Sequence, residues 1–104
     1  MKAVKASLLA LDIIEMPVFE WDEKKEKSNF RKHGINFNEG ESVFYDLHSL
    51  TISDPDHSIE EHRFIDIGTS NKNRVLVVNY TERENRIRII SVRKATNAER
   101  KMYE

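Results

Sequence analysis

The chain has 104 residues, with 17 Lys and Arg, 18 Asp and Glu, and no cysteine. This length suits one small domain, and a hydrophobic share of 38% can fill a single core. The absence of cysteine excludes disulfides, thiolate metal sites and cysteine nucleophiles, and no apolar run reaches the ~20 residues that a membrane span requires. We therefore expect a small globular protein with a cytoplasmic location and no membrane contact.

The net charge of −1 conceals an asymmetry along the chain. Residues 1–60 carry 7 basic and 12 acidic side chains, whereas residues 61–104 carry 10 basic and 6 acidic ones. Seven of the eight arginines lie in the second part. This distribution indicates an anion-facing surface, for which nucleic acid is the commonest partner. A surface laced with salt bridges is the alternative interpretation.

Residues 1–16 combine a short basic start with an apolar run, as a secretory signal does. Asp12 interrupts the apolar run and no small-x-small cleavage site follows, so we expect no export. Leu8, Leu11 and Ile14 recur at helical spacing. We interpret the segment as an amphipathic N-terminal extension that packs on the domain or binds a partner, or as a start codon placed too early. The domain itself is predicted over residues 17–104.

The next elements are a short strand and two helices. Residues 18–21 are predicted as the strand, and Asp22 then caps a helix that Gly34 ends. Within this helix we expect Phe30 to be the buried position. Asn38 is the predicted cap of a second helix, whose inner side chains are Val43, Phe44 and Leu47.

The remainder of the chain predicts strands joined by hairpins, at residues 50–53, 62–67, 74–80 and 86–94. Residues 75–78 are apolar at every position, so their strand should be central. In the last strand, alternation puts Ile87 and Ile89 on one face with Arg93, and Arg88 and Val92 on the other.

A capping box of Thr96 and Glu99 opens a final helix. The predicted fold is therefore α+β: an antiparallel β-meander of about four strands, with two N-terminal helices and one C-terminal helix segregated to one face.

Several short motifs resemble the BrnT toxin family, and together they cover residues 19–104 in order. The pairing of the opening with the last strand is the most specific part of this resemblance. The motifs are Phe19-Glu20-Trp21-Asp22, Asn29-x-x-Lys32-His33-Gly34, Phe44-x-Asp46, Asp54-x-Asp56-His57, Glu61-x-Arg63-Phe64, Tyr80-Thr81-Glu82-Arg83, Ile87-Arg88-Ile89-Ile90-Ser91-Val92-Arg93-Lys94-Ala95 and Glu99-Arg100-x-x-Tyr103-Glu104.

This resemblance implies a RelE-like fold and the toxin component of a type II toxin–antitoxin system. It implies an endoribonuclease that inhibits translation. It also implies a BrnA-type antitoxin partner, whose ribbon-helix-helix domain binds operator DNA, so that this chain meets DNA only indirectly.

Metal-free RNA cleavage needs a proton acceptor for the 2′-hydroxyl, a proton donor for the 5′-oxygen and cations for the phosphate. Arginine suits the last role because its planar fork binds two phosphate oxygens. We expect Arg63 and Arg93 to stabilise the phosphate. By resemblance to the RelE superfamily, Arg93 is the arginine at the end of the last strand and Tyr103 is the C-terminal tyrosine. The alternative, purely structural interpretations are that Arg63 pairs with Glu61 or Asp66 and that Tyr103 packs on the sheet.

For proton transfer we expect His62 or Tyr103, and the further candidates are Glu61, His57 and His33. At a helix C-terminus His33 has a sufficient structural reason, because the helix dipole favours a cation there. Tyr80 is predicted as core or rim.

A wider basic field is expected to bind RNA phosphates without sequence choice, or to receive an acidic antitoxin segment. It comprises Arg83, Arg86, Arg88, Lys94, Arg100 and Lys101.

We predict no metal and no other cofactor. Asp54, Asp56, His57 and His62 offer hard ligands within nine positions, but Asp-Pro-Asp is ordinary turn sequence. Two other functions stay open. The chain could be a catalytically inactive toxin homologue that binds its antitoxin as a co-repressor, or a stand-alone nucleic-acid-binding module.

Overall fold

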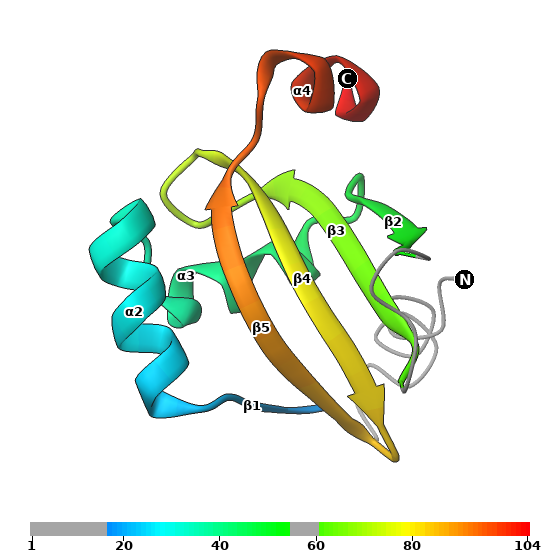
Figure 1. Ribbon diagram of the computed structural model, residues 1–104. Coiled ribbons are helices and arrows are strands. Elements are labelled where there is room, and N and C mark those ends of the chain that lie inside the picture. Colours follow the sequence, from blue (N-terminus) through cyan, green and yellow to red (C-terminus); the bar gives the residue numbers. More distant parts are fainter. Residues whose placement is uncertain (1–16, 55–60) are drawn as a thin grey trace.

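The computed structural model describes residues 17–54 and 61–104, which form a five-stranded sheet with helices around it (Figure 1). The elements in chain order are β1 (Val18–Glu20), α2 (Glu23–His33), α3 (Phe37–Ser42), the 3₁₀ turn η1 (Val43–Tyr45), β2 (Leu50–Ser53), β3 (Arg63–Thr69), β4 (Val75–Arg83), β5 (Arg86–Lys94) and α4 (Asn97–Tyr103).

The strand order in the sheet is β1-β5-β4-β3-β2. The strands β2 to β5 form the predicted antiparallel meander, and β1 adds a parallel fifth strand beside β5. The prediction that residues 75–78 lie in a central strand is confirmed, because β4 lies between β3 and β5. The α+β class is confirmed. The sheet has five strands, one more than the predicted meander of about four.

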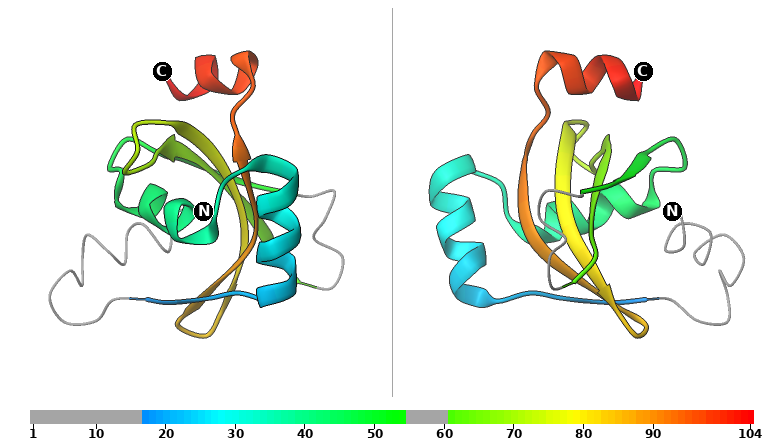
Figure 2. Two further views of the ribbon diagram at one scale, coloured as in Figure 1. Left: turned by 90° about the vertical axis from the view of Figure 1, so that its left-hand side faces the viewer. Right: turned by 45° about the vertical axis from the view of Figure 1, so that its right-hand side comes forward.

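We expected all the helices on one face of the sheet, and this prediction is wrong (Figure 1 and Figure 2). Figure 1 shows α3 behind the sheet and α2 along the outer side of β5. In both views of Figure 2, α4 lies beyond one end of the sheet, apart from the other two helices. The core fills the space between the sheet and α3. Its buried side chains are Ile35, Phe37, Val43, Phe44, Phe64, Leu76, Val78, Tyr80, Ile87, Ile89 and Val92.

Helix α2 begins and ends where the sequence predicts. The carboxylate of Asp22 accepts from the backbone N–H of Lys24 at 2.8 Å, and Gly34 takes the left-handed conformation with φ 72°. The expected burial of Phe30 is wrong, because 51% of this residue is exposed. The buried residue of α2 is its neighbour Asn29.

Asn29 joins α2 to the backbone of β5. Its amide nitrogen donates to the carbonyl oxygen of Val92 at 2.9 Å, and its amide oxygen accepts from the Val92 N–H at 3.1 Å. The same nitrogen donates to the carbonyl oxygen of Ile35 at 3.1 Å. Because β1 pairs only with residues 86–88 of β5, the Asn29 amide acts at Val92 as a neighbouring strand would.

The second helix differs from its prediction in two details. Its cap is Asn36, whose side chain accepts from the Glu39 N–H at 2.9 Å, whereas Asn38 is exposed within the helix. Val43 and Phe44 are buried as expected, but Leu47 is 65% exposed because the chain leaves the core after η1.

A β-bulge changes the predicted faces of β5. Asn79 pairs with Ser91 and Tyr80 pairs with Ile89, so Ile90 is an extra residue. The inward side chains are therefore Ile87, Ile89 and Val92, and Arg93 points to the face opposite the core. Simple alternation failed here because it assumes an uninterrupted ladder.

The predictions for residues 1–16, Asp56 and His57 lie outside the described residues. No helix in the described part of the chain is long and apolar enough to cross a membrane.

We predict that Asn29→Ala lowers the free energy of unfolding by about 2–4 kcal/mol, because it leaves buried backbone groups of Val92 and Ile35 without their hydrogen bonds. Urea unfolding measures this. The matched control is Asn38→Ala, at an exposed position, which should change stability by less than ~0.5 kcal/mol. Equal losses in the two variants would contradict the role of Asn29.

Candidate functional site

Five arginines lie on the sheet face opposite α3. Val77, Thr81 and Arg83 are alternate residues of β4, so they share one face, and directly paired residues of neighbouring strands point the same way. Thr81 pairs with Arg63 and Arg88, Arg83 pairs with Arg86, and Val77 pairs with Arg93. We call this surface the arginine face. It consists of Arg63, Arg83, Arg86, Arg88 and Arg93.

Two glutamates partner the arginines at the hairpin end of this face. Glu61 accepts from Arg83 at 2.9 Å and lies 3.7 Å from Arg63. Glu20 of β1 accepts from Arg86 at 3.1 Å and from Arg88 at 3.2 Å. Hydrogen bonds from Arg83 and from Arg86, respectively, lower the pKa of Glu61 and of Glu20. Both carboxylates are ionised at neutral pH and bind the arginines beside them.

Arg93 has its own carboxylate partner at the opposite end of the face. Its two terminal nitrogens each donate to one oxygen of Glu99, both at 2.8 Å. Glu99 also accepts from the Thr96 N–H at 2.8 Å, which completes the predicted capping box of α4. The hydrogen bonds from Arg93 lower the pKa of Glu99 to about 2.

Tyr103 lies in a second polar cluster at this end. Its hydroxyl donates to Oδ2 of Asp46 at 2.5 Å and lies 2.8 Å from the hydroxyl of Thr69. The Thr69 N–H donates to the same Asp46 oxygen at 2.8 Å. Burial and the bond to Asp46 raise the pKa of Tyr103. Burial opposes ionisation of Asp46, but the bonds from Thr69, Tyr103 and His48 outweigh it and lower the pKa of that carboxyl.

The four predicted catalytic residues thus fall in three places. Arg93 and Tyr103 both lie at the α4 end, Arg93 through its bonds to Glu99 and Tyr103 as the last residue of the helix. Arg63 lies on the same face, four residues along β3 from Ile67, and Ile67 is level with Arg93 because both pair with Val77. Arg63 and Arg93 are therefore roughly 13 Å apart along the strand direction. His62 lies on the other side of the sheet, because its ring stacks on the core residue Phe64 with centroids 4.7 Å apart.

The other predicted residues are distributed as follows. Arg83, Arg86 and Arg88 belong to the arginine face, whereas Lys94, Arg100 and Lys101 are exposed near or on α4. Tyr80 is buried in the core, and this burial raises the pKa of its hydroxyl above the ordinary value. Arg63 forms an ion pair with Glu61, as its purely structural interpretation predicted. His33 is half-buried at the last residue of α2.

Sequence reasoning missed Asp46 and Thr69, and assigned Glu99 only to a helix cap. Asp46 stands in one of the quoted motifs, but its position beside the hydroxyl of Tyr103 depends on contacts 57 residues apart. Within residues 17–54 and 61–104, no three His, Asp or Glu side chains are grouped as metal ligands. A further ion pair lies away from the arginine face, where the buried Glu39 accepts from Nε of the half-buried Arg74 at 2.9 Å and from Ser70.

We predict that acid weakens the fold partly through Glu99. Because folding lowers the pKa of Glu99 from 4.5 to about 2, its contribution is complete above pH 4.5 and is lost as the pH falls towards 2. Glu99→Gln retains the helix cap but removes this titration. Urea unfolding between pH 5 and 2.5 should therefore give a shallower loss of stability in Glu99→Gln than in the wild type. Parallel pH profiles would show that the pair contributes nothing to the fold.

Comparisons with known proteins show the family and the fold of this chain. Residues 21–99 match the family described as "Ribonuclease toxin, BrnT, of type II toxin-antitoxin system". None of the curated proteins matches the chain. The crystal structure of the Brucella abortus ribonuclease toxin BrnT is similar in fold, with a TM-score of 0.59 and 24% identity, and the match covers 77% of this chain and 99% of that chain. Because the family match spans well over half of its residues, the chain belongs to the BrnT family of ribonuclease toxins of type II toxin–antitoxin systems.

Proposed function

We propose that this protein is an endoribonuclease that cleaves RNA on the arginine face without a metal ion and thereby inhibits translation in the cytoplasm. The observation that carries the proposal is the gathering of five arginines on one face of the sheet, in a chain whose family is one of ribonuclease toxins. Five arginines meet three glutamates there, which leaves a formal excess of two positive charges. Such a surface attracts a phosphate backbone.

The chemistry that we assign is internal transesterification. The 2′-oxygen attacks the neighbouring phosphorus, the bond from phosphorus to the 5′-oxygen breaks, and a 2′,3′-cyclic phosphate and a 5′-hydroxyl result. Arg93 is the first candidate for binding the phosphate oxygens in this step, because its fork can donate two parallel hydrogen bonds. Arg63 would hold the backbone of the same RNA strand further along the face, since roughly 13 Å along the strands and two strand spacings of roughly 5 Å each separate the two arginines.

Of the two proton-transfer candidates, we assign Tyr103 rather than His62. Tyr103 lies at the Arg93 end, whereas the His62 ring packs on the opposite side of the sheet. Its phenol is protonated at neutral pH, because its pKa is raised above an already high ordinary value, and it can give this proton to the departing 5′-oxygen, which is a stronger base than a phenolate. Asp46 positions the hydroxyl, and removal of the 2′-proton is left to water or to a group of the substrate.

We further propose that a BrnA-type antitoxin neutralises the protein and that its ribbon-helix-helix domain carries the complex to operator DNA. Support comes from the family, in which a toxin is paired with an antitoxin. The arginine face would attract acidic residues of such a partner as well as it attracts RNA.

One observation favours the second candidate function, an inactive homologue that serves as co-repressor. Both terminal nitrogens of Arg93 are already bonded to Glu99, so the best phosphate-binding edge is occupied in the free protein. An inactive member of this kind would bind the antitoxin but leave RNA intact.

We predict that purified wild-type protein cleaves RNA in EDTA without ribosomes and that Arg93→Ala lowers the rate by about 10²–10³-fold, because one cationic donor is lost from the transition state. Gel analysis of a labelled RNA measures the rate, and its products should end in a cyclic phosphate. The matched control is Arg31→Ala, an exposed arginine on α2 away from the face, which should cleave at nearly the wild-type rate.

Equal cleavage by all three proteins would remove Arg93 from the site. No cleavage by any of them, including in the presence of ribosomes, would favour the inactive homologue or a simple nucleic-acid-binding module.

A further inference from the structure

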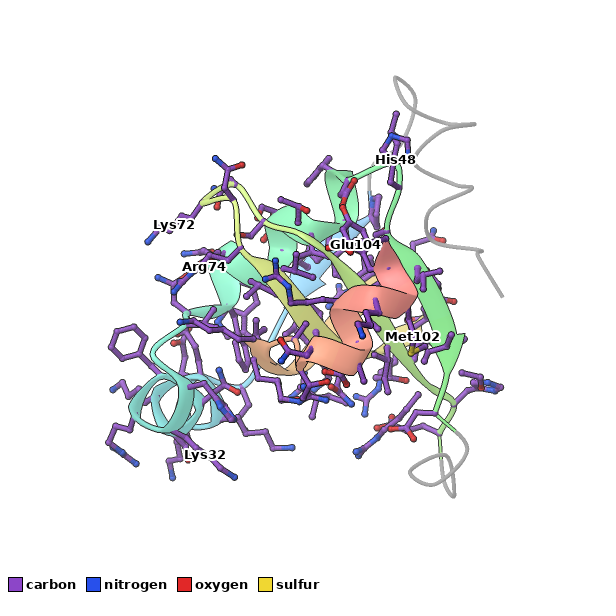
Figure 3. The ribbon with its side chains drawn as sticks, turned by 90° about the horizontal axis from the view of Figure 1, so that it is seen from above. Lys32, His48, Lys72, Arg74, Met102 and Glu104 are labelled. Atoms are coloured by element: carbon purple, nitrogen blue, oxygen red, sulfur yellow. The ribbon has the colours of Figure 1, made fainter. Side chains whose placement is uncertain are left out.

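Helix α4 is attached to the rest of the protein by polar contacts. None of its residues is buried, and its side chain Met102 is 53% exposed. Seen from above, Met102 on the helix and Glu104 just after it lie over the end of the sheet, while Lys72 and Arg74 lie at the neighbouring β3–β4 turn (Figure 3). The side-chain attachments described above are the pair of Glu99 with Arg93 and the bonds of Tyr103 to Asp46 and Thr69. These bonds place Glu99 beside Arg93 and fix α4 over the end of the sheet.

The attachment through Glu99 uses the part of Arg93 that would bind a phosphodiester. A guanidinium presents two parallel N–H groups, and a carboxylate and a phosphate offer the same pair of oxygens to them. Arg83, Arg86 and Arg88, in contrast, each reach a carboxylate through a single terminal nitrogen. Of these four arginines, Arg93 is the one whose two terminal nitrogens both donate to the same carboxylate.

The charge of Glu99 is not needed for its other role. In a capping box the residue at this position accepts from the backbone N–H of the cap, and glutamine does so as well as glutamate. Glu99 performs this role by accepting from the Thr96 N–H. The carboxylate therefore adds an ion pair with Arg93 to a helix start that an uncharged side chain would also form.

We propose that Glu99 is an internal competitor of RNA: its carboxylate occupies the phosphate-binding edge of Arg93 in the free protein, and a phosphodiester must displace it to bind there. This inference rests on the proposed function for the identity of the ligand. It makes the strength of the pair between Glu99 and Arg93 a determinant of how readily the enzyme takes up RNA. Glu99 would act on binding through Arg93 and would not itself contact the reacting atoms.

The test measures binding separately from cleavage. The probe is a fluorescent single-stranded RNA with 2′-O-methyl groups throughout, which lacks the attacking hydroxyl and cannot be cut. Anisotropy at fixed low salt gives its dissociation constant with wild type, Glu99→Gln, Arg93→Ala and the double variant. The control for a general change of charge is Glu104→Gln, at an exposed residue just after the same helix.

Removal of the competitor should raise affinity about fivefold, as expected when an ion pair worth about 1 kcal/mol no longer has to be broken. Glu104→Gln should give a clearly smaller gain. In the Arg93→Ala background the gain from Glu99→Gln should vanish, because there is no longer a fork to release. A second variant, Glu99→Asp, keeps the charge on a shorter side chain and should give an intermediate affinity.

An unchanged or weaker affinity of Glu99→Gln would overturn the inference, as would a gain that persists without Arg93. These results are distinguishable from failure of the proposed function. Tighter binding of the uncleavable probe by Glu99→Gln without cleavage of ordinary RNA would support the competitor and reject the nuclease. Cleavage of ordinary RNA with no effect of Glu99→Gln on binding would do the reverse.

Discussion

The arrangement of the whole molecule depends on one residue of β5, Val92, at which both N-terminal helices meet the sheet. Asn29 of α2 bonds to the N–H and the carbonyl of its backbone. Gly40 of α3 lies against its side chain so closely that an added Cβ would be 2.5 Å from Val92 Cγ2. The hydrogen bonds of the Asn29 amide and the lack of a side chain at Gly40 thus position two helices on one strand. The outer edge of β5, left open beyond β1, is closed by this contact.

The same strand then divides the protein into a packing side and a chemical side. The bulge at Ile90 lets Val92 turn into the core while Arg93, the next residue, points to the opposite face. Without the extra residue, a strand of regular alternation would place Arg93 together with Ile87 and Ile89. The bulge therefore determines that the arginine of the last strand joins the other four instead of being buried. Bulges often redirect side chains in this way near functional sites.

The features that could be predicted from the sequence are those that local rules decide. Asp22, Gly34 and the Thr96–Glu99 box mark helix ends through short-range hydrogen bonds, and the apolar residues 75–78 mark a central strand. The failures share a physical cause, which is that tertiary contacts decided them. Hydropathy favours Phe30 over Asn29, yet three backbone partners make the amide the better buried residue. Likewise, no local pattern reveals the bulge at Ile90 or brings Asp46 beside Tyr103. The arginines themselves could be predicted, but their common face required the register.

The place of α4 in the chain, after all the residues of the core cluster, has a consequence for how such a gene can change. The core residues of the described part all precede residue 93, while Glu99 and Tyr103 follow it. A stop codon just after Lys94 would remove the helix, its carboxylate and its tyrosine, yet keep every residue of the core cluster. Under the proposed function, such a truncation would remove the tyrosine assigned to proton transfer and keep the residues of the core cluster. A lineage could therefore lose cleavage in a single mutational step while it keeps the residues that form the core.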